Sequence, residues 1–447
     1  MNYSSKHFLL INPWIYDTAA YDFWLKPLGL LYVGSILKYQ GHKVSLIDLM
    51  NRYDKYFFEN NLIKDRYYGT GKFYYEEVEK PEVIKDIPRK FKRYGLPKSE
   101  FLKRLKDYED VDAILVTSVM TYWYYGVYKT IETIREIFPD KPIFLGGIYV
   151  NIMPMHAKKQ FKDLNVYVIN GTGNIAIKNI LDYYDLDIKE IDWFEDLEPA
   201  YELYEGDIPN IIITSSIGCP FRCTYCVTPR MWRYQKRSVK NIIKSLEKML
   251  EKKPVNDVVF FDDAFLIHPK KEELLKELSK FNVRYHLPNG IHARLVNEKI
   301  AKLFAKANFK VIKLGYETSD EEMQQKTGSK VTNEDLEKAA KYLLSEGLTE
   351  TSAYIMANLP DQKVEDVIRG INFCKNLGIE PSVNEFTPIP NTPQYEELIS
   401  RGWLNRNTDP LLLNNSFLPY WWKYGMTVEE IEGIKAYLRE VKSKRGI

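Results

Sequence analysis

The sequence contains few cysteines and no long apolar segment. Only 4 of its 447 residues are Cys, and three of these fall within eight residues. That distribution excludes the disulfide framework of a small secreted protein. No apolar run approaches the roughly 18 residues that a membrane-spanning helix needs. The early apolar run 8–15 is interrupted by Asn12 and Pro13, so it lacks the layout of a signal peptide. We therefore expect a cytoplasmic protein without a membrane span.

The chain also lacks a strong excess of charge of either sign. Lys and Arg together number 63 and Asp and Glu 61, which leaves a net charge of +2. A surface built for nucleic acid would carry a large positive excess, so no nucleic-acid partner is expected. Hydrophobic residues make up 45% of the chain and aromatic residues 14%. This composition does not fit a disordered chain and supports a sizeable core, in two to four domains at this length.

The first part of the chain alternates strand and helix patterns. The strands are predicted at 8–13, 43–48, 113–118, 142–145 and 166–169, and the helices between them include 28–39 and 128–138. Five parallel strands with intervening helices predict a doubly wound, Rossmann-like α/β domain over residues 1–195. Such a sheet binds ligands at the carboxyl ends of its strands.

Residues 51–110 interrupt this alternation. We interpret them as an insertion that carries short helices or a lid, because sixty residues are too many for a plain connection. The segment Gly69-Thr70-Gly71-Lys72 resembles a phosphate-binding loop but lacks the G-x-x-x-x-G-K-[ST] spacing. It is therefore interpreted as a turn.

A second alternation begins at residue 211. Its six strands are predicted at 211–214, 258–261, 285–291, 311–315, 352–356 and 382–386. Six strand–helix units in about 180 residues favour a partial, TIM-like (β/α)6 barrel over residues 205–395. The acidic stretch 192–207 is predicted to be a linker, and 396–447 a short helical tail with a final helix at 428–442.

The cysteine triplet follows the first strand of the predicted barrel. Cys219, Cys223 and Cys226 have the spacing C-x3-C-x2-C. Three thiolates on one loop can hold three corners of a 4Fe–4S cluster, and one iron would stay open because no fourth Cys is near. A zinc site is the alternative, but no His lies within forty residues of Cys226. The remote Cys374 is expected to be a small buried side chain of a helix at 367–377.

This triplet, with an aromatic residue before its last Cys and a barrel downstream, resembles the signature of the radical S-adenosylmethionine (SAM) superfamily. The resemblance covers residues 211–393. It implies that SAM binds the open iron of the cluster and is cleaved reductively to methionine and a 5′-deoxyadenosyl radical. It also implies an electron donor such as flavodoxin or ferredoxin.

The same resemblance implies SAM contacts for five further residues. Tyr225 would lie by the adenine, Asp262 and Asp263 by the methionine ammonium, Arg294 by the methionine carboxylate, and Glu317 by the ribose or the amino-acid end. Alternatively, Asp262 or Asp263 caps a helix, and Arg294 and Glu317 pair only with each other.

Two segments of the predicted barrel depart from the family pattern. Ala357, Asn358 and Gln362 replace the usual Gly and Glu residues after the fifth strand, which puts the adenine contact there in doubt. Asn391 replaces a Gly in the turn that follows the sixth strand, and Asn tolerates the left-handed backbone that such a turn can require.

A doubly wound domain before such a barrel resembles the cobalamin-binding branch of the superfamily. The resemblance implies cobalamin contacts for Pro27, Leu28, Gly29, Gly146 and Gly147, and the glycine pair would let the ligand approach the backbone closely. The D-x-H-x-x-G motif for a lower axial His is absent, so a lower-face residue would come from the loop 118–125. The usual G-E-G-E segment is replaced by Gly-Thr-Gly-Asn at 171–174. A domain that keeps the fold without cobalamin is the alternative.

We predict a cobalamin-dependent radical SAM methyltransferase that acts on an unactivated carbon of a small-molecule, lipid or natural-product substrate. One alternative is a cobalamin-free radical SAM enzyme that catalyses rearrangement, cyclisation or RNA methylthiolation. Methylthiolating relatives carry an additional N-terminal Cys trio, whereas no Cys precedes Cys219 here. The other alternative is a non-catalytic metal-binding protein.

Overall fold

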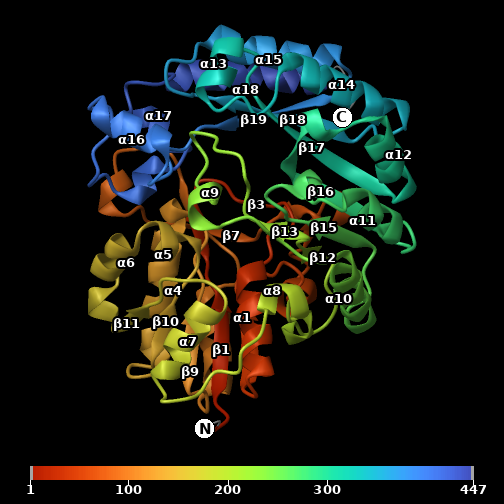
Figure 1. Cartoon of the computed structure of the whole chain (residues 1–447). Helices are drawn as coiled ribbons and strands as arrows, with labels where there is room; N and C mark the ends of the chain where they lie inside the picture. Colours follow the sequence, from red (N-terminus) through yellow and green to blue (C-terminus); the bar gives the residue numbers. More distant parts are fainter. Residues whose placement is uncertain (1–3, 444–447) are drawn as a thin grey trace. The chain divides into compact units, whose positions relative to one another are not determined.

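The computed structural model describes residues 4–443, which divide into two compact units (Figure 1). Unit 1 comprises the residues up to Ile212 together with Lys244–Val255. Unit 2 comprises Ile213–Ile243 and the residues from Asn256 onward. Helix α10 (Val239–Lys252) therefore contributes to both units.

Unit 1 is built on a five-stranded parallel sheet in the order β11-β10-β9-β1-β4. Its strands are β1 (His7–Asn12), β4 (Lys43–Asp48), β9 (Ala113–Val116), β10 (Ile143–Leu145) and β11 (Val166–Val168). The chain runs outward in one direction from β1 to β4 and in the other from β9 to β11. The carboxyl ends of β1 and β9 therefore form the topological switch point at which such sheets bind ligands. The predicted doubly wound sheet is confirmed.

Helices cover this sheet. Helices α1 (Leu28–Tyr39) and α7 (Asn174–Asp182) share a core with sheet residues that include Phe8, Leu10 and Phe144 (Figure 1). Alternate residues of β1 point to one face, so Phe8 and Leu10 both reach this core. Helix α4 (Tyr124–Ile137) begins four residues before the predicted start, because the 3-10 turn Thr121–Trp123 leads directly into it.

The insertion contains antiparallel strands as well as the expected short helices. Two small sheets have the orders β2-β8-β7 and β3-β6-β5. Their strands are β2 (Ile15–Asp17), β3 (Tyr21–Asp22), β5 (Lys64–Asp65), β6 (Gly71–Lys72), β7 (Tyr75–Val78) and β8 (Phe91–Tyr94), and the helices are α2 (Lys55–Glu59) and α3 (Lys98–Leu105). Strands of two to four residues are too short to show a clear alternation, so the sequence did not predict them.

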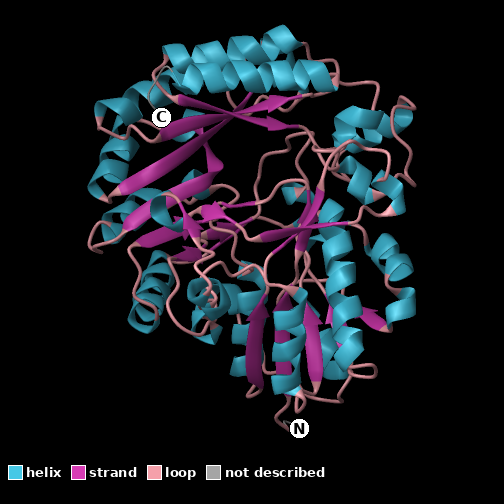
Figure 2. Ribbon diagram, turned by 180° about the vertical axis from the view of Figure 1, so that it is seen from behind, coloured by secondary structure: helices cyan, strands magenta, loops and turns pink. Residues whose placement is uncertain are grey.

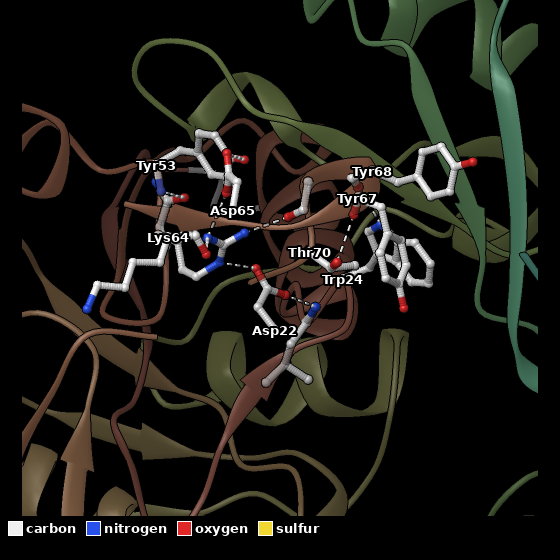
Figure 3. Close-up of polar contacts among 12 residues, drawn as sticks. Asp22, Trp24, Tyr53, Lys64, Asp65, Tyr67, Tyr68 and Thr70 are labelled. Carbon is white, nitrogen blue, oxygen red and sulfur yellow. Dashed lines mark hydrogen bonds and ion pairs between the residues drawn. The ribbon is translucent and has the colours of Figure 1, made fainter. Parts of the chain in front are cut away.

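A buried arginine holds one of these sheets together (Figure 3). The Arg52 side chain is 3% exposed, and its Nε lies 2.9 Å from Asp22 and its Nη1 2.8 Å from Asp65. Its Nη2 donates to the Gly69 carbonyl at 2.6 Å, and the Thr70 hydroxyl donates to the Tyr67 carbonyl at 2.7 Å. The segment 69–72, which was interpreted as a turn, therefore contains the end of the 3-10 turn Tyr67–Gly69 and strand β6, and it packs on the arginine.

The acidic stretch 192–207, predicted to be a linker, folds onto unit 1. It contains α8 (Trp193–Asp196) and the 3-10 turn Tyr201–Leu203. Tyr204 is buried, and its hydroxyl donates to Asp48 at 2.6 Å. Glu198 lies 3.1 Å from Lys248 of α10. The stretch is thus folded against unit 1, and Glu198 pairs with a lysine of α10, instead of forming an extended linker.

The barrel sheet has the strand order β12-β15-β16-β17-β18-β19, which follows the chain. The strands are β12 (Asn210–Ile213), which crosses the unit boundary, β15 (Asp257–Phe260), β16 (Arg284–His292), β17 (Phe309–Glu317), β18 (Thr351–Ala357) and β19 (Glu380–Glu385). The four ladders from β15 to β19 are parallel. Each strand lies within two residues of its predicted bounds, and the sequential order is that of a partial barrel.

Helices connect and cover the strands of unit 2. The connecting helices are α11 (Lys271–Leu278), α12 (Glu298–Lys306), α13 (Glu321–Lys326), α14 (Asn333–Ser345) and α15 (Val364–Asn376). The tail adds α16 (Pro393–Ser400), α17 (Leu418–Trp421) and α18 (Val428–Ser443). Helices α15 and α18 lie side by side against β19 (Figures 1 and 2). Across residues 4–443, no helix has the length and apolarity needed to cross a membrane.

Candidate functional site

The three clustered cysteines lie on one loop of unit 2. The loop runs between β13 (Ser216–Ile217) and β14 (Gln235–Lys236), which pair antiparallel after β12. Cys223 is buried, Cys219 and Cys226 are half-buried, and all three are free of disulfides. Burial raises the pKa of Cys219 to about 11 and also raises the pKa of Cys223. Because the thiolate is the metal-binding form, these thiols would release their protons when a cation binds.

The loop is fixed by contacts from distant parts of unit 2. The Thr224 N–H donates to the Thr327 carbonyl at 3.2 Å, and the Gln394 N–H donates to the Thr224 carbonyl at 3.0 Å. A Cβ on Gly328 would lie 3.2 Å from the Cys223 Cα, so a side chain there would press on the loop. The protein thereby sets the backbone of Cys223 in advance of any ligand.

A zinc site and a 4Fe–4S cluster place different requirements on the three cysteine thiols. Within the described residues, no three His, Cys, Asp or Glu side chains converge enough to hold a single metal ion. A tetrahedral zinc site needs all its thiolates about 2.3 Å from one ion. A cubane instead takes each thiolate on a different iron, so its ligands stand farther apart. Three thiols on one loop are the donor set that a 4Fe–4S cluster with one open iron requires.

Asp262 and Asp263 bind the loop itself. Asp262 is 4% exposed and accepts hydrogen bonds from the Ser215 N–H at 3.0 Å and the Ser216 hydroxyl at 2.7 Å. Asp263 accepts from the Gly218 N–H at 2.9 Å. Burial raises the pKa of Asp262 to about 6. Both carboxyls were assigned to the methionine ammonium or to a helix cap, but their hydrogen-bond donors here belong to the segment that leads into the cysteines.

Glu317 and Tyr225 come together beside a lysine that the sequence did not single out. Glu317 ends β17 in the left-handed region, with φ 73°, and its carboxylate lies 3.7 Å from the Lys330 ammonium. Burial raises the pKa of Glu317, and Lys330 opposes this effect. Burial raises the pKa of Tyr225, and the charges of Glu317 and Cys223 raise it further.

Lys330 gives this region its positive charge. After the effect of burial, Lys330 lowers the pKa of both Cys219 and Cys223. The side chain is 17% exposed, so its charge is only partly screened by solvent. It follows α13 in a segment without a motif, so no sequence signal identified it. An ammonium in this position favours thiolates and other anions at the loop.

Arg294 does not pair with Glu317. Its Nη2 donates to the Ser329 carbonyl at 2.6 Å, and its Nε lies 3.7 Å from Asp335. The guanidinium therefore supports the segment that carries Lys330. The alternative of an isolated Arg294–Glu317 pair is wrong, and a contact with a SAM carboxylate stays a prediction.

The departures from the family pattern are accommodated locally. Asn358 and Asn391 both have a left-handed backbone, with φ of 68° and 70°, as predicted for Asn391. Gln362 accepts from the Leu359 N–H at 3.0 Å and donates to the Met356 carbonyl at 2.9 Å. Cys374 is fully buried in α15, which confirms its interpretation as a structural residue.

In unit 1, the glycine pair after β10 serves two different purposes. A Cβ on Gly147 would lie 2.2 Å from the Ser118 carbonyl oxygen, so the close approach there is to the protein's own backbone. The space that a side chain at Gly147 would fill is therefore occupied by the protein itself, and a contact between Gly147 and cobalamin stays a prediction. A Cβ on Gly146 would meet only the Ile169 oxygen, at 3.9 Å, and Gly29 has nothing within 4 Å. Gly146 and Gly29 thus remain approachable.

The other predicted residues of unit 1 lie near the switch point. Pro27 precedes α1, of which Leu28 is the first residue. Pro27 also lines a water-sized cavity of about 30 Å³, whose other walls include Asn12, the last residue of β1, and Val119, in the segment that follows β9. His42 precedes β4 and is therefore at the amino end of the parallel strands, away from this edge.

Comparison with known families identifies the barrel. Residues 213–374 match the model of the radical SAM superfamily, and this range contains the cysteine loop and strands β15 to β18. This part of the chain is therefore a radical SAM domain, as the spacing of the cysteines and the barrel pattern predicted.

Several relatives extend the likeness beyond the barrel. An uncharacterized methyltransferase of Pyrococcus horikoshii is 23% identical over 381 residues, which cover 77% of this chain and 79% of the relative. An anaerobic magnesium-protoporphyrin IX monomethyl ester cyclase of Cereibacter sphaeroides is 23% identical over 334 residues, 64% of this chain but only 53% of the cyclase. The radical SAM methyltransferase TsrM from Kitasatospora setae, solved with cobalamin and a 4Fe–4S cluster bound, superposes with a TM-score of 0.66 at 17% identity and covers 98% of this chain and 91% of TsrM. At that identity the superposition establishes the fold.

Proposed function

We propose that this protein is a cobalamin-dependent radical SAM methyltransferase that methylates an unactivated carbon of a small molecule. The observation that carries the proposal is the extent of the likeness to TsrM, which includes the doubly wound sheet as well as the barrel. TsrM has also been solved with tryptophan as its substrate, which supports a substrate of small-molecule or natural-product size. The methyltransferase relative of Pyrococcus horikoshii supports the same reaction class.

In this proposal, residues 1–195 form the cobalamin-binding domain, 205–395 the radical SAM core and 396–447 the tail. Cys219, Cys223 and Cys226 hold the 4Fe–4S cluster, which with SAM supplies the 5′-deoxyadenosyl radical. The protein keeps the cysteine loop in place through Asp263, Thr327 and Gln394. Lys330 offsets negative charge at the loop, and the half-buried Glu317 and Tyr225 lie where they can orient SAM.

Unit 1 offers cobalamin the carboxyl edge of its sheet. Pro27 borders the switch point, and Leu28 follows it at the start of α1. The backbones of Gly29 and of Gly146, after β10, can be approached by a ligand. The loop 118–125 after β9 would face the lower side of the corrin ring, and Met120 of that loop is 43% exposed. When bound, cobalamin supplies the methyl carrier. A flavodoxin or ferredoxin would deliver electrons, which suits a reducing cytoplasm.

Cofactor stoichiometry tests the proposal. The protein is purified without oxygen, its cluster is reconstituted, and excess hydroxocobalamin is added and removed. About four irons and one corrinoid per chain are expected, read by iron assay and absorbance. Four irons without corrinoid would contradict methyl transfer and leave cobalamin-free radical chemistry.

Two cysteine variants test the cluster itself. Cys223→Ala removes one proposed ligand and should abolish both cluster retention and the release of 5′-deoxyadenosine from SAM. Cys374→Ala is the matched control, because Cys374 is also buried but lies in α15 away from the triplet in sequence. Unchanged deoxyadenosine production by Cys223→Ala would contradict the catalytic assignment.

A further inference from the structure

His292, the last residue of β16, is buried without a hydrogen-bond partner. It is 1% exposed, and neither Nδ1 nor Nε2 has a partner in the described structure. A buried polar group left unsatisfied costs about 1–3 kcal/mol. An apolar side chain would avoid that cost, so the position suits a residue that bonds a group bound from outside.

The ring of His292 is held against the cysteine loop. It stacks on Phe221, which lies between Cys219 and Cys223, with the ring centroids 4.3 Å apart and the planes inclined by 26°. Stacking fixes the plane of the imidazole, and both nitrogens point outward within that plane. The direction of any hydrogen bond from the ring is therefore set by the loop that carries the thiols.

The charges around His292 favour an anionic or electron-rich acceptor. Burial, together with the charges of Lys330 and Arg294, lowers the pKa of His292 to about 3, so the ring is neutral and carries one N–H donor. Both neighbours are cations and cannot accept a hydrogen bond. The N–H consequently lacks an acceptor until a group with lone pairs occupies the space beside the loop.

A second histidine of the same strand shows the contrast. His286 is also fully buried in β16, but its Nε2 lies 2.9 Å from the Asp257 carboxylate. Asp257 in turn holds Arg284 at 2.7 Å. The fold thus supplies a hydrogen-bond partner for His286, near the amino end of the strand, and none for His292, at its carboxyl end. The carboxyl end of the strands is where barrel enzymes have their active sites.

We propose that His292 is a cofactor-binding residue whose neutral ring donates a hydrogen bond to the 4Fe–4S cluster–SAM complex at the cysteine loop. This inference rests on the proposed function of the loop. Two acceptors share the required chemistry, a sulfur of the cluster and the carboxylate of SAM. A hydrogen bond to cluster sulfur raises the reduction potential of the cluster, and one to the carboxylate strengthens SAM binding.

The test measures the cluster potential and SAM affinity in the reconstituted full chain. His292→Leu should retain its iron but shift the potential to more negative values or weaken SAM binding severalfold. If the reduction potential shifts in the absence of SAM, the His292 N–H bonds the cluster. If the potential shifts only in the presence of SAM, or if SAM binds more weakly, the N–H bonds SAM. His286→Leu is the control and should lower thermal stability while leaving both quantities unchanged. Unchanged potential and affinity in His292→Leu would overturn the inference.

Two further variants keep the test decisive where His292→Leu loses its cluster. His292→Gln retains an N–H donor and should restore part of the wild-type potential or SAM affinity. Phe221→Leu keeps the donor but releases the ring, and should give a smaller change of the same sign. Wild-type values in Phe221→Leu together with no recovery in His292→Gln would overturn the inference. Failure of the proposed function is separate, because it would be seen in the wild-type protein itself, either as four irons without corrinoid or as the absence of a four-iron cluster.

Discussion

At the residue scale, Asp262 makes the stability of the protein depend on pH. Its folded pKa is about 6 because burial disfavours the charge, whereas an unfolded Asp titrates near 3.9. Between about pH 4 and pH 6, the Asp262 carboxyl therefore holds a proton in the folded state that it lacks in the unfolded state. This contribution to stability is fully present below about pH 4 and is lost as the pH rises through 6. A difference of two pKa units corresponds to about 3 kcal/mol.

Asp262→Asn should consequently flatten the pH dependence of the free energy of unfolding between pH 4 and 6. The measurement is urea unfolding of the cluster-free protein at several pH values. Asp257→Asn is the matched control, because hydrogen bonds from Arg284 and His286 outweigh burial and lower the pKa of Asp257. That variant should lose stability without flattening this pH window. An equal slope in Asp262→Asn and wild type would contradict the assignment.

The residues of the site differ in how far sequence could reveal them. The three cysteines can be recognised from the sequence because their close spacing along the chain places three thiols on one loop. His292 and Lys330 are not, because their significance depends on Phe221, Glu317 and other groups that only the fold brings near. Asp262 and Asp263 were found by position after a strand, yet position alone could not show that their oxygens are occupied by Ser215, Ser216 and Gly218.

At the scale of elements, the long strands and helices were predictable and the insertion was not. β16 and β17 are nine residues long each, and α14 begins with a capping box at Thr332 and Asp335. The sheets of the insertion consist of strands of two to four residues. Part of the stability of these sheets comes from Arg52 and not from a repeating pattern of apolar residues. Hydrophobic periodicity therefore could not predict their strands.

Arg52→Met should therefore destabilise unit 1 strongly. The substitution leaves the Asp22 carboxylate, 6% exposed, without its cation, and breaking a buried pair in this way costs about 3–5 kcal/mol. Urea unfolding measures the loss. Combining Arg52→Met with Asp22→Asn should recover part of it, because the unpaired charge is then gone.

The exposed pair Lys55–Glu59 of the same insertion provides the control. Its side chains are 83% and 59% exposed, so Lys55→Met should change the free energy of unfolding by less than about 1 kcal/mol. A loss in Arg52→Met no larger than in Lys55→Met would show that Arg52 does not hold the sheet.

At the scale of the whole molecule, two units with separate sheets are expected to respond to different cofactors. A ligand stabilises the part that binds it, by about 2.7 kcal/mol at one hundred times its dissociation constant. Local opening of that part becomes rarer, and amide hydrogen exchange slows there. The proposed function assigns cobalamin to the carboxyl edge of the unit 1 sheet and the cluster to the loop between β13 and β14.

Hydroxocobalamin should therefore slow exchange in the segments after β1, β9 and β10, and cluster reconstitution should slow it from Cys219 to Cys226. Mass-spectrometric exchange of the wild-type chain, with each cofactor added separately, measures both patterns. Cys223→Ala provides the internal control, because it should lose the second pattern and keep the first. If hydroxocobalamin slowed exchange only in the cysteine loop, the assignment of cobalamin to unit 1 would be contradicted. The doubly wound sheet would then be present without binding the ligand that its topology accommodates.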